Sequence, residues 1–473
     1  MQLKPGSHIH MMGICGTAMG GLAGLLKAMG YKVTGSDQNV YPPMSTQLEK
    51  LGIKIKEGYK RENLTPRPDF VIVGNVMTRK HDEVQALLET DIPYTSLPDA
   101  LGRFVIEDRK SIVIAGTHGK TTTTAMAAWV AKECGKDPGF LIGGKPQNFD
   151  TSFELPRGDY FVIEGDEYDT AFFAKVPKFL FYRPRYVILT SVEFDHADIY
   201  KDLDDVKKAF NGLMDIVPED GIIVSFADDA NTPSVVKHAK AKKVLTYGIE
   251  NGEYQARNIR FTEQYCEFEV VRHGQTEDTV QISIFGRHNV ANALAVYVLT
   301  KNLGWPVDKI KTGLRTFKGV KRRQEILGKP NGITVIEDFA HHPTAVKVTI
   351  ESIHERFKDR RLFAIFEPRS ATSRRKVFQK DYVNAFSGPW DVLLAQPFNQ
   401  AALAETDRFS SEELVSDLHK GGTRAKLLPN VQEIVDFVGR EAKPGDVVLI
   451  MSNGGFDGIY GKMLDRLGQA ARS

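Results

Sequence analysis

The residues Ile-Val-Ile-Ala-Gly-Thr-His-Gly-Lys-Thr-Thr-Thr-Thr, positions 112–124, form the pattern on which the predicted fold depends. The β-branched run Ser111–Ala115 predicts a buried parallel strand, and Ala125–Cys134 continues as a predicted helix. A glycine-rich loop between a strand and a helix N-terminus exposes backbone amides and the positive end of the helix dipole, and both attract phosphate. The stretch therefore predicts a phosphate-binding loop.

Two side chains in this loop carry further chemistry. Lys120 adds a point charge for terminal phosphates, and the Thr121 hydroxyl can reach a bound Mg²⁺. The strict pattern G-x-x-x-x-G-K-[ST] is not met, because Ile114 stands where its first glycine would be. The remaining run from Gly116 to Thr122 still favours phosphate binding over an incidental glycine-rich turn.

Length and composition limit the class of protein. A chain of 473 residues predicts about three domains, at ~100–200 residues each. With 42% hydrophobic and 26% charged residues, the composition is that of a soluble globular protein. The net charge of only +2 gives no reason to expect nucleic acid or an anionic membrane as a partner. Any specificity for anions must therefore be local.

Cysteine usage and hydropathy bear on location. Cys15, Cys134 and Cys266 are far apart and form no C-x-x-C pair, which argues for a reducing compartment and against a zinc site or a disulfide framework. The N-terminus has no basic region followed by an apolar segment, and no run of 18 apolar residues occurs. We expect a cytoplasmic protein, either a monomer or a weak homo-oligomer.

A second glycine-rich loop lies near the N-terminus. His8–Gly13 is a predicted strand, and Met19–Met29 is a predicted helix. Between them Cys15 takes the second glycine position of the dinucleotide fingerprint, although Asp37 lies where a ribose-binding carboxylate would be. A dehydrogenase is thus one alternative, but it would leave the loop at Gly116 unexplained. A different nucleotide-diphosphate site agrees with both loops, and a tight turn without ligand stays open.

The third predicted strand, Phe70–Val73, ends at Gly74 and Asn75. Ligands of open α/β sheets bind at the carboxyl ends of the strands. Both residues are therefore candidate ligand contacts.

Carboxylates follow two later strands. Tyr160–Ile163 ends in Glu164-Gly-Asp-Glu167, and Tyr186–Ser191 ends in a segment that contains Glu193, Asp195 and His196. Oxygen-rich strand ends after a phosphate loop are suited to magnesium. We expect a metal site near Thr121. His196 could bind metal, orient a phosphate or only bond within its own turn.

Residues 221–285 contain short β-type runs that predict an extra small sheet. A helix then opens with Asn289 and Asn292 on one face. Their amides can both accept from and donate to an adenine edge, although asparagine at a helix start is more commonly a cap. The basic run Lys318–Arg323 could move over a phosphate at a hinge, or it could be a solvated surface.

A third unit begins near Glu325. Its predicted strands Ile333–Ile336, Arg361–Phe366 and Val447–Met451 each end in a polar or glycine-rich turn. This arrangement predicts a further ligand-binding edge.

Together these motifs resemble the Mur ligase family of peptidoglycan enzymes over nearly the whole chain. The resemblance rests on the following segments: 116–123, 164–167, Asp195-His196, 288–293, Arg322-Arg323 and 338–343. Gly13-Ile-Cys-Gly16 together with Gly35-Ser-Asp37 resembles the UDP-sugar domain of the branch that accepts UDP-N-acetylmuramate.

The resemblance implies an α/β fold in the three-domain Mur ligase architecture. Residues 1–107 would form a Rossmann-like domain that binds UDP-N-acetylmuramate, and 108–324 a central P-loop ATPase domain with the extra small sheet. Residues 325–473 would form a Rossmann-like domain that closes over ATP and binds the peptide. Some relatives carry a carbamylated lysine that holds a second magnesium, but no lysine here has a diagnostic context for that role.

The implied activity is that of an ATP-dependent carbon–nitrogen ligase that forms an acyl phosphate. One branch attaches the recycled murein tripeptide L-alanyl-γ-D-glutamyl-meso-diaminopimelate to UDP-N-acetylmuramate, and another attaches L-alanine in de novo synthesis. The segments that favour the tripeptide branch are 74–77, 168–173, 182–185, 193–198, 366–370 and 452–456. A nicotinamide dehydrogenase would need the N-terminal loop alone to be catalytic, and a non-enzymatic nucleotide sensor would leave the acidic strand ends unexplained.

The resemblance also implies a role for individual residues. Those expected in catalysis are Lys120, His196 and Arg323. Those expected to bind ATP are Gly116, Thr117, His118, Gly119, Lys120, Thr121, Thr122, Asn289, Asn292, Arg323, Asp338 and His342. Those expected to bind Mg²⁺ are Thr121, Glu164 and His196. Those expected at the UDP-sugar are Gly13, Gly16, Thr17, Ser36, Asp37, Gly74 and Asn75, and those at the peptide are Arg369, Ser370 and Asn453.

Overall fold

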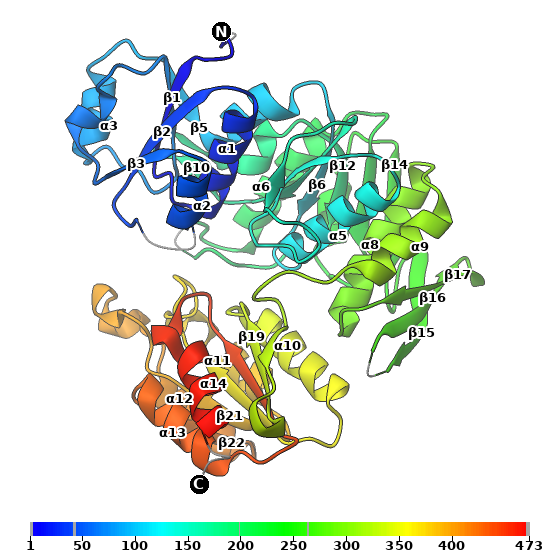
Figure 1. Ribbon diagram of the computed structural model, residues 1–473. Helices are drawn as coiled ribbons and strands as arrows, with labels where there is room; N and C mark the ends of the chain where they lie inside the picture. The colour runs from blue at the N-terminus through cyan, green and yellow to red at the C-terminus, as the bar shows by residue number, and fades with distance from the viewer. Residues whose placement is uncertain (1–2, 41–43, 198, 263, 470–473) are drawn as a thin grey trace.

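The computed structural model describes residues 3–40, 44–197, 199–262 and 264–469 (Figure 1). Asp198, the last residue of the segment 193–198, lies outside these residues. The chain forms three α/β units in sequence order, coloured from blue through green to red in Figure 1. None of the helices in the described residues is long and apolar enough to span a membrane.

The first unit is built on a parallel sheet of five strands in the order β3-β2-β1-β4-β5. Its strands are β1 (His8–Met12), β2 (Lys32–Asp37), β3 (Lys54–Glu57), β4 (Phe70–Val73) and β5 (Tyr94–Ser96). Its helices are α1 (Thr17–Ala28), α2 (Met44–Lys50), α3 (Asp82–Leu88) and α4 (Leu97–Leu101), followed by the turn Gly102–Ile106. The strand order reverses between β1 and β4, so the loops after these two strands meet at one edge.

The second unit is a mixed sheet of ten strands in the order β17-β16-β15-β14-β13-β12-β6-β9-β7-β8. Its first strands are β6 (Lys110–Ala115), β7 (Gly139–Leu141), β8 (Phe153–Glu154), β9 (Tyr160–Gly165) and β12 (Pro184–Leu189). The others are β13 (Ile222–Phe226), β14 (Lys243–Gly248), β15 (Tyr254–Phe261), β16 (Cys266–Arg272) and β17 (Gln275–Ile282). Its helices are α5 (Lys120–Glu133), α6 (Leu203–Ile216), α7 (Thr232–Val236), α8 (Arg287–Asn302) and α9 (Val307–Thr316).

The strands expected as an extra small sheet continue the central sheet instead. β13 and β14 are parallel members of it, and β15–β17 add an antiparallel extension at its edge. Figure 1 shows this extension beyond α8 and α9. Three of the predicted runs, 222–225, 243–247 and 267–271, lie within β13, β14 and β16, and the run 280–284 overlaps only the end of β17. The sequence missed β15, which joins the parallel part of the sheet to the antiparallel part.

The hairpin β10 (Asp169–Ala171) and β11 (Ala174–Pro177) follows the acidic end of β9. Phe172 and Phe173 at its tip pack against a core cluster of the first unit. This contact connects the two units beside the loops of the first one.

The third unit contains six strands in the order β18-β19-β23-β20-β21-β22, all parallel except the edge strand β18. The strands are β18 (Glu325–Gly328), β19 (Thr334–Asp338), β20 (Leu362–Phe366), β21 (Asp391–Leu394), β22 (Arg424–Leu427) and β23 (Val447–Met451). The helices are α10 (Pro343–Arg356), α11 (Gln379–Phe386), α12 (Ser411–Lys420), α13 (Val431–Glu441) and α14 (Ile459–Gln469).

The first two units share a hydrophobic core. Ile112 and Ile114 of β6 face the cluster formed with α5, α8 and α9, whereas Val113 and Ala115 face the cluster that includes α1. At the junction α1 lies very close to β7 and β8, since a Cβ on Gly24 would lie 2.1 Å from Phe153 Cζ. The third unit has hydrophobic clusters of its own, and polar contacts such as Thr344 to Glu193 connect it to the second unit.

Candidate active site

The phosphate loop connects β6 to α5 and is held against two neighbouring elements. Gly116 has φ +132°, and a Cβ there would lie 2.2 Å from Thr190 Oγ1 after β12. Gly119 has φ +80°, and a Cβ there would lie 2.9 Å from Asn292 Oδ1 of α8. Both positions therefore require glycine.

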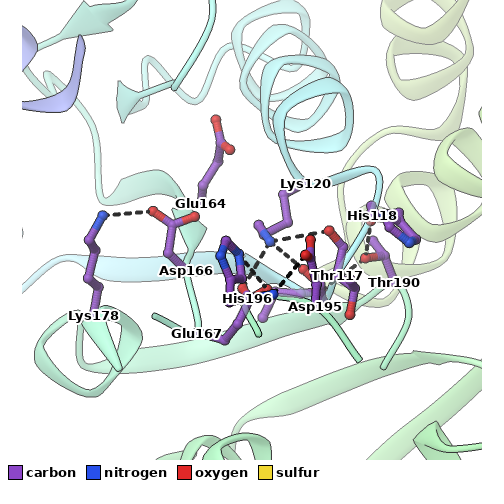
Figure 2. Close-up of polar contacts among 12 residues, drawn as sticks. Thr117, His118, Lys120, Glu164, Asp166, Glu167, Lys178, Thr190, Asp195 and His196 are labelled. Carbon is purple, nitrogen blue, oxygen red and sulfur yellow. Dashed lines mark hydrogen bonds and ion pairs between the residues drawn. The ribbon is translucent and has the colours of Figure 1, made fainter. Parts of the chain in front are cut away.

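Lys120 lies under the loop with 12% of its side chain exposed. Its ammonium donates to Gly116 O at 2.6 Å and to Glu167 Oε2 at 2.9 Å (Figure 2). Burial opposes the charge, but Glu167 and its acidic neighbours raise the pKa of Lys120 above its usual value. A permanent cation therefore lies at the loop.

The two predicted magnesium ligands Thr121 and Glu164 are in contact. Thr121 Oγ1 donates to Glu164 Oε2 at 2.8 Å, and Gly143 N donates to Glu164 Oε1 at 2.6 Å. Removal from water, and next the charge of Asp166, raises the pKa of Glu164. A cation bound here would reverse that shift.

The third predicted magnesium ligand, His196, lies elsewhere in the described structure. Its Nε2 is 3.8 Å from Glu167 Oε1, and its ring packs against Tyr168 at 5.0 Å between centroids. Figure 2 shows His196 beside Glu167 and Lys120, with the Glu164 carboxylate pointing the other way. His196 thus contacts Glu167 and Tyr168, and its expected role toward magnesium stays a prediction.

Lys178 is a site residue that the sequence did not reveal. Its ammonium is 3.2 Å from Asp166 Oδ2 and lies 4.0 Å from the centre of the Tyr168 ring. Although burial opposes it, Lys178, followed by Lys120, lowers the pKa of Asp166. The cluster thus holds two cations among three carboxylates. Nothing in the sequence around Lys178 distinguished it from a surface lysine.

A cavity of about 560 Å³ opens beside the loop. Gly119, Thr122, Asn289 and Asn292 line one part of it, and an apolar part is lined by Phe226, Tyr247, Ile249 and Phe285. Asn292 Nδ2 donates to Asn289 Oδ1 at 3.2 Å, and Asn289 Nδ2 donates to Phe285 O at 2.7 Å. The Asn289 amide is therefore used within the protein, whereas Asn292 lies directly against the loop.

The segment between the second and third units reaches the phosphate loop. An Arg323 guanidinium nitrogen lies 3.5 Å from Thr121 Oγ1, and the guanidinium lies over the Phe339 ring at 4.7 Å. Asp338 accepts from Gln324 N at 2.8 Å and from Ala340 N at 2.7 Å. The basic run is therefore at the active site, as its position between two α/β units suggested.

The predicted UDP-sugar residues gather at one edge of the first sheet, with one exception. Gly16, Thr17 and Asn75 are exposed there, and a Cβ on Gly13 would lie 3.9 Å from Gly74 Cα. The glycine loop, residues 13–16, is held by a hydrogen bond to Asp37.

Asp37 holds the glycine loop through backbone amides. Its carboxylate accepts from Cys15 N at 2.8 Å and from Asn39 N at 2.9 Å. One oxygen thus binds the glycine loop and the other binds the turn after β2, which differs from the free ribose-binding carboxylate of a dinucleotide site.

Ser36 is the exception, because its side chain points into the core. It is fully buried and donates to Glu83 Oε2 at 2.7 Å. Glu83, which the sequence did not identify, also lies 2.7 Å from His10 Nε2. Ser36 could therefore reach a ligand only through its backbone, and its expected side-chain contact is corrected.

The predicted peptide residues lie together at the edge of the third sheet. The Arg369 guanidinium stacks on the Phe398 ring at 3.7 Å and is 3.4 Å from Glu367 Oε1. A Cβ on Gly454 would lie 2.1 Å from Arg369 Nε, so the turn after β23 is in contact with this arginine. Asn453 Oδ1 in that turn is buried and has no hydrogen-bond partner in the described part of the chain. Ser370 hydrogen-bonds to Ser373 at 2.9 Å.

Family models match each of the three units. The model described as "Mur ligase family, catalytic domain" matches residues 8–109, "Mur ligase middle domain" matches 114–300, and "Mur ligase, glutamate ligase domain" matches 322–454.

Individual relatives cover almost the whole chain. The chain is 43% identical to the UDP-N-acetylmuramate–L-alanyl-γ-D-glutamyl-meso-2,6-diaminoheptandioate ligase of Escherichia coli, over 98% of this chain and 99% of that protein. It is 32% identical to a UDP-N-acetylmuramate–L-alanine ligase of Clostridium botulinum, over 94% and 95% of the two chains. The crystal structure of a murein peptide ligase from Psychrobacter arcticus superposes with a TM-score of 0.73 at 38% identity, covering 98% and 99% of the two chains. The chain belongs to the Mur ligase family.

Proposed function

We propose that this chain is an ATP-dependent ligase that joins UDP-N-acetylmuramate to the tripeptide L-alanyl-γ-D-glutamyl-meso-diaminopimelate in peptidoglycan recycling. One observation carries the proposal. The hinge residue Arg323 reaches Thr121 of the phosphate loop, so the ligand edges of the second and third units face the same space. The identity of 43% to a ligase with this activity supports the choice of substrates.

ATP would occupy the cavity beside the phosphate loop. Gly116 and Gly119 let the loop pack directly against Thr190 and Asn292, where a Cβ would collide with these side chains. The adenine would lie against the apolar part of the cavity and Asn292, and Asp338 would hold the ribose. His118 and Thr122 complete the wall on the phosphate side.

Mg²⁺ would be held by Thr121 and Glu164, because the donor set consists of oxygens and the pKa of Glu164 is raised. The ion would neutralise charge on the terminal phosphates. His196 would instead act near Glu167 and Lys120, where the acyl group and the transferred phosphate would meet. At that position His196 would help to place a second metal ion or the acyl phosphate.

The reaction follows from the weak electrophilicity of a carboxylate. An oxygen of the muramoyl carboxylate attacks the γ-phosphorus of ATP, and ADP leaves. The peptide amine then attacks the carbonyl carbon of the acyl phosphate, its nitrogen loses a proton to solvent, and inorganic phosphate leaves with the electron pair of the broken C–O bond. Lys120 and Arg323 would stabilise the negative charge that passes between these groups, which is mainly positioning and electrostatics.

Each of the three proposed domains is built on one large sheet. We place the UDP-sugar domain at 1–107, the ATPase domain at 108–324 and the peptide-binding domain at 325–473, since one of the three large sheets lies within each interval. Arg369 and Asn453 would bind peptide carboxylates or amides, because an arginine fork meets a carboxylate bidentately. We also propose a cytoplasmic enzyme, a monomer or weak homo-oligomer, whose three cysteines are free in the described chain.

The test is ADP release with UDP-N-acetylmuramate and a panel of amines. We expect efficient turnover with the tripeptide and at most trace turnover with L-alanine. A comparable or higher kcat/KM with L-alanine would assign the chain to the other branch, to which it is 32% identical in Clostridium botulinum. Calorimetry with the UDP-sugar and with NAD tests the dehydrogenase alternative. The proposed ligase should bind the UDP-sugar and not NAD, whereas a dehydrogenase should bind NAD and not the UDP-sugar.

A further inference from the structure

Two histidines and a carboxylate from three separate segments meet beside the cavity. His118 belongs to the phosphate loop, Glu193 follows β12, and His342 is the N-cap of α10. One ligand atom from each lies within 4.8 Å of the other two. We propose that His118, Glu193 and His342 form a binding site for a zinc ion that bridges the central and C-terminal domains.

The distances suit a tetrahedral ion after a small contraction. Glu193 Oε2 is 3.6 Å from His118 Nε2 and 4.0 Å from His342 Nδ1. Zinc bonds of about 2.0–2.2 Å place neighbouring ligand atoms of a tetrahedron about 3.3 Å apart. Two histidines and one carboxylate are a common zinc donor set and leave a fourth position open. Here that position is available to water or a ligand, because His118 and Glu193 also line the cavity.

His342 can offer the lone pair of its Nδ1 atom to the proposed zinc ion. Its Nε2 is 3.2 Å from Phe194 O, and a carbonyl can only accept, so the ring donates from Nε2 and keeps its lone pair on Nδ1. Burial, and next the neighbouring His118, lowers the pKa of His342 to about 4, so the ring is neutral at pH 7. Metal-binding histidines are usually held by such a hydrogen bond from the other ring nitrogen. The competing contact on Nδ1, from Thr344 N, is long at 3.3 Å.

The His118 and Glu193 side chains also have free or oriented ligand atoms for a cation. His118 Nε2 is buried and has no hydrogen-bond partner among residues 3–40, 44–197, 199–262 and 264–469. Glu193 accepts from Thr344 Oγ1 at 2.6 Å, which orients the carboxylate. A buried polar atom without a partner is unfavourable, and an ion would satisfy it.

This site differs from the proposed magnesium site in both place and chemistry. Thr121 and Glu164 offer oxygens alone, whereas imidazole nitrogen favours zinc and its neighbours over magnesium. The cysteine spacing argued against a zinc site, and the proposed site contains no cysteine. Only His342 comes from the C-terminal domain, so the full set of three ligands requires contact between the two domains.

A bound ion would therefore fasten the C-terminal domain to the phosphate loop. His118 and Glu193 belong to the central unit, and His342 moves with the third. Zinc alone should then favour the closed arrangement of the full-length chain in the absence of nucleotide.

The experiment measures zinc binding to the nucleotide-free, full-length protein in competition with a chromophoric chelator. We expect one ion per chain, bound at least ~10-fold more weakly in His118→Gln, Glu193→Gln and His342→Gln, since even loss of a group that only orients a ligand weakens metal binding by about 10–100-fold. His273→Gln is the matched control, because that exposed histidine is 3.7 Å from Glu253 and is not part of the cluster. Equal affinity in wild type and all three variants overturns the proposal.

Two measurements on the wild-type protein keep the test independent of the folding of the variants. Anomalous diffraction at the zinc edge should place the ion among the three side chains, and an ion bound only elsewhere overturns the site. Small-angle scattering should show a smaller radius of gyration with zinc, and no such change in His342→Gln. An unchanged radius with zinc bound at the three ligands overturns the bridging role.

Discussion

The hydroxyl of Thr372 in the C-terminal domain donates a hydrogen bond to Asp195 Oδ1 of the central domain at 2.8 Å, and both side chains are buried. Asp195 directly precedes His196 and also accepts from its backbone amide at 2.7 Å. Despite burial, the nearby histidines, His196 first, hold the pKa of Asp195 well below its usual range, so the carboxylate is ionised. The third unit is thereby in contact with the segment that carries the expected catalytic histidine.

Replacing Thr372 should weaken closure. Thr372→Val keeps the shape but leaves a buried carboxylate without this donor, and a hydrogen bond to a charged group contributes about 1.5–3 kcal/mol. We expect the KM for ATP to rise roughly 10-fold or more and the radius of gyration to increase. Thr312→Val is the control, because that hydroxyl bonds within its own helix to Asp308 O. An unchanged KM and radius would show that the contact does not stabilise the closed arrangement.

Lys120→Ala should reduce kcat by at least ~10²-fold, since it removes an electrostatic stabiliser of the transferred phosphate. The structure adds a second effect, because Glu167 would remain buried without its lysine partner, and removing one partner of a buried ion pair costs about 3–5 kcal/mol in stability. The double variant Lys120→Ala/Glu167→Gln should recover stability in thermal unfolding but not turnover. Lys208→Ala, which breaks an exposed pair with Asp205, should change neither quantity. Turnover near wild type in either Lys120 variant would contradict the assignment.

Glu164→Gln should weaken magnesium binding while preserving side-chain volume. One amide oxygen can still accept from Thr121 or Gly143, but the charge that attracts the cation is lost. We expect a higher magnesium requirement in steady-state kinetics and partial recovery at high Mg²⁺. Glu219→Gln is the control, because Glu219 is exposed and pairs only with Lys242 among the described side chains. If the magnesium titrations of Glu164→Gln and wild type coincide, Glu164 is not a ligand.

Arg369→Ala should impair use of the peptide more than use of the other substrates. The guanidinium is held by Phe398 and by the turn at Gly454, so its position does not depend on the ligand. We expect the KM for the tripeptide to rise about 10-fold or more, the value for loss of one charge-assisted hydrogen bond of about 1.5–3 kcal/mol. Calorimetric affinities for ATP and the UDP-sugar should stay close to wild type. The exposed Arg440 supplies the control variant Arg440→Ala, and equal losses for all three substrates would contradict a peptide role.

His288 should contribute to the loss of folding stability at acidic pH. Burial lowers its pKa from 6.5 to about 4, and its Nδ1 has no hydrogen-bond partner among the described residues. The unfolded chain therefore binds the proton more readily, and stability is lost as the pH falls from about 6.5 to about 4. The lost free energy of unfolding is up to about 3 kcal/mol.

The check is the Tm as a function of pH. His288→Gln cannot take up this proton, so its Tm should fall less than that of wild type between pH 7 and pH 4.5. His273→Gln removes an exposed histidine and should follow wild type. Parallel curves for wild type and His288→Gln would exclude a contribution from His288.

Local pattern was sufficient to predict most strands of the fold. The runs Phe70–Val73 and Val447–Met451 are strands with the predicted bounds, because a strand buried on both faces reads as a continuous apolar run. The phosphate loop was predictable for a similar reason, since its glycines and Lys120 lie within a few residues of one another. Local pattern does not show which strands pair with one another. In the structure β15–β17 extend the central sheet instead of forming a separate one.

The sequence by itself determined the strands, the glycine loops and the kinds of side chain at each ligand edge. Only the tertiary structure decided which of those side chains face a ligand. The Ser36 hydroxyl hydrogen-bonds to Glu83, which is 47 residues away in the sequence, and Asp195 hydrogen-bonds to Thr372, which is 177 residues away. The orientation of a polar side chain depends on the partner that replaces its lost water, and such partners come from elements that are distant in the chain and become neighbours only in the folded protein.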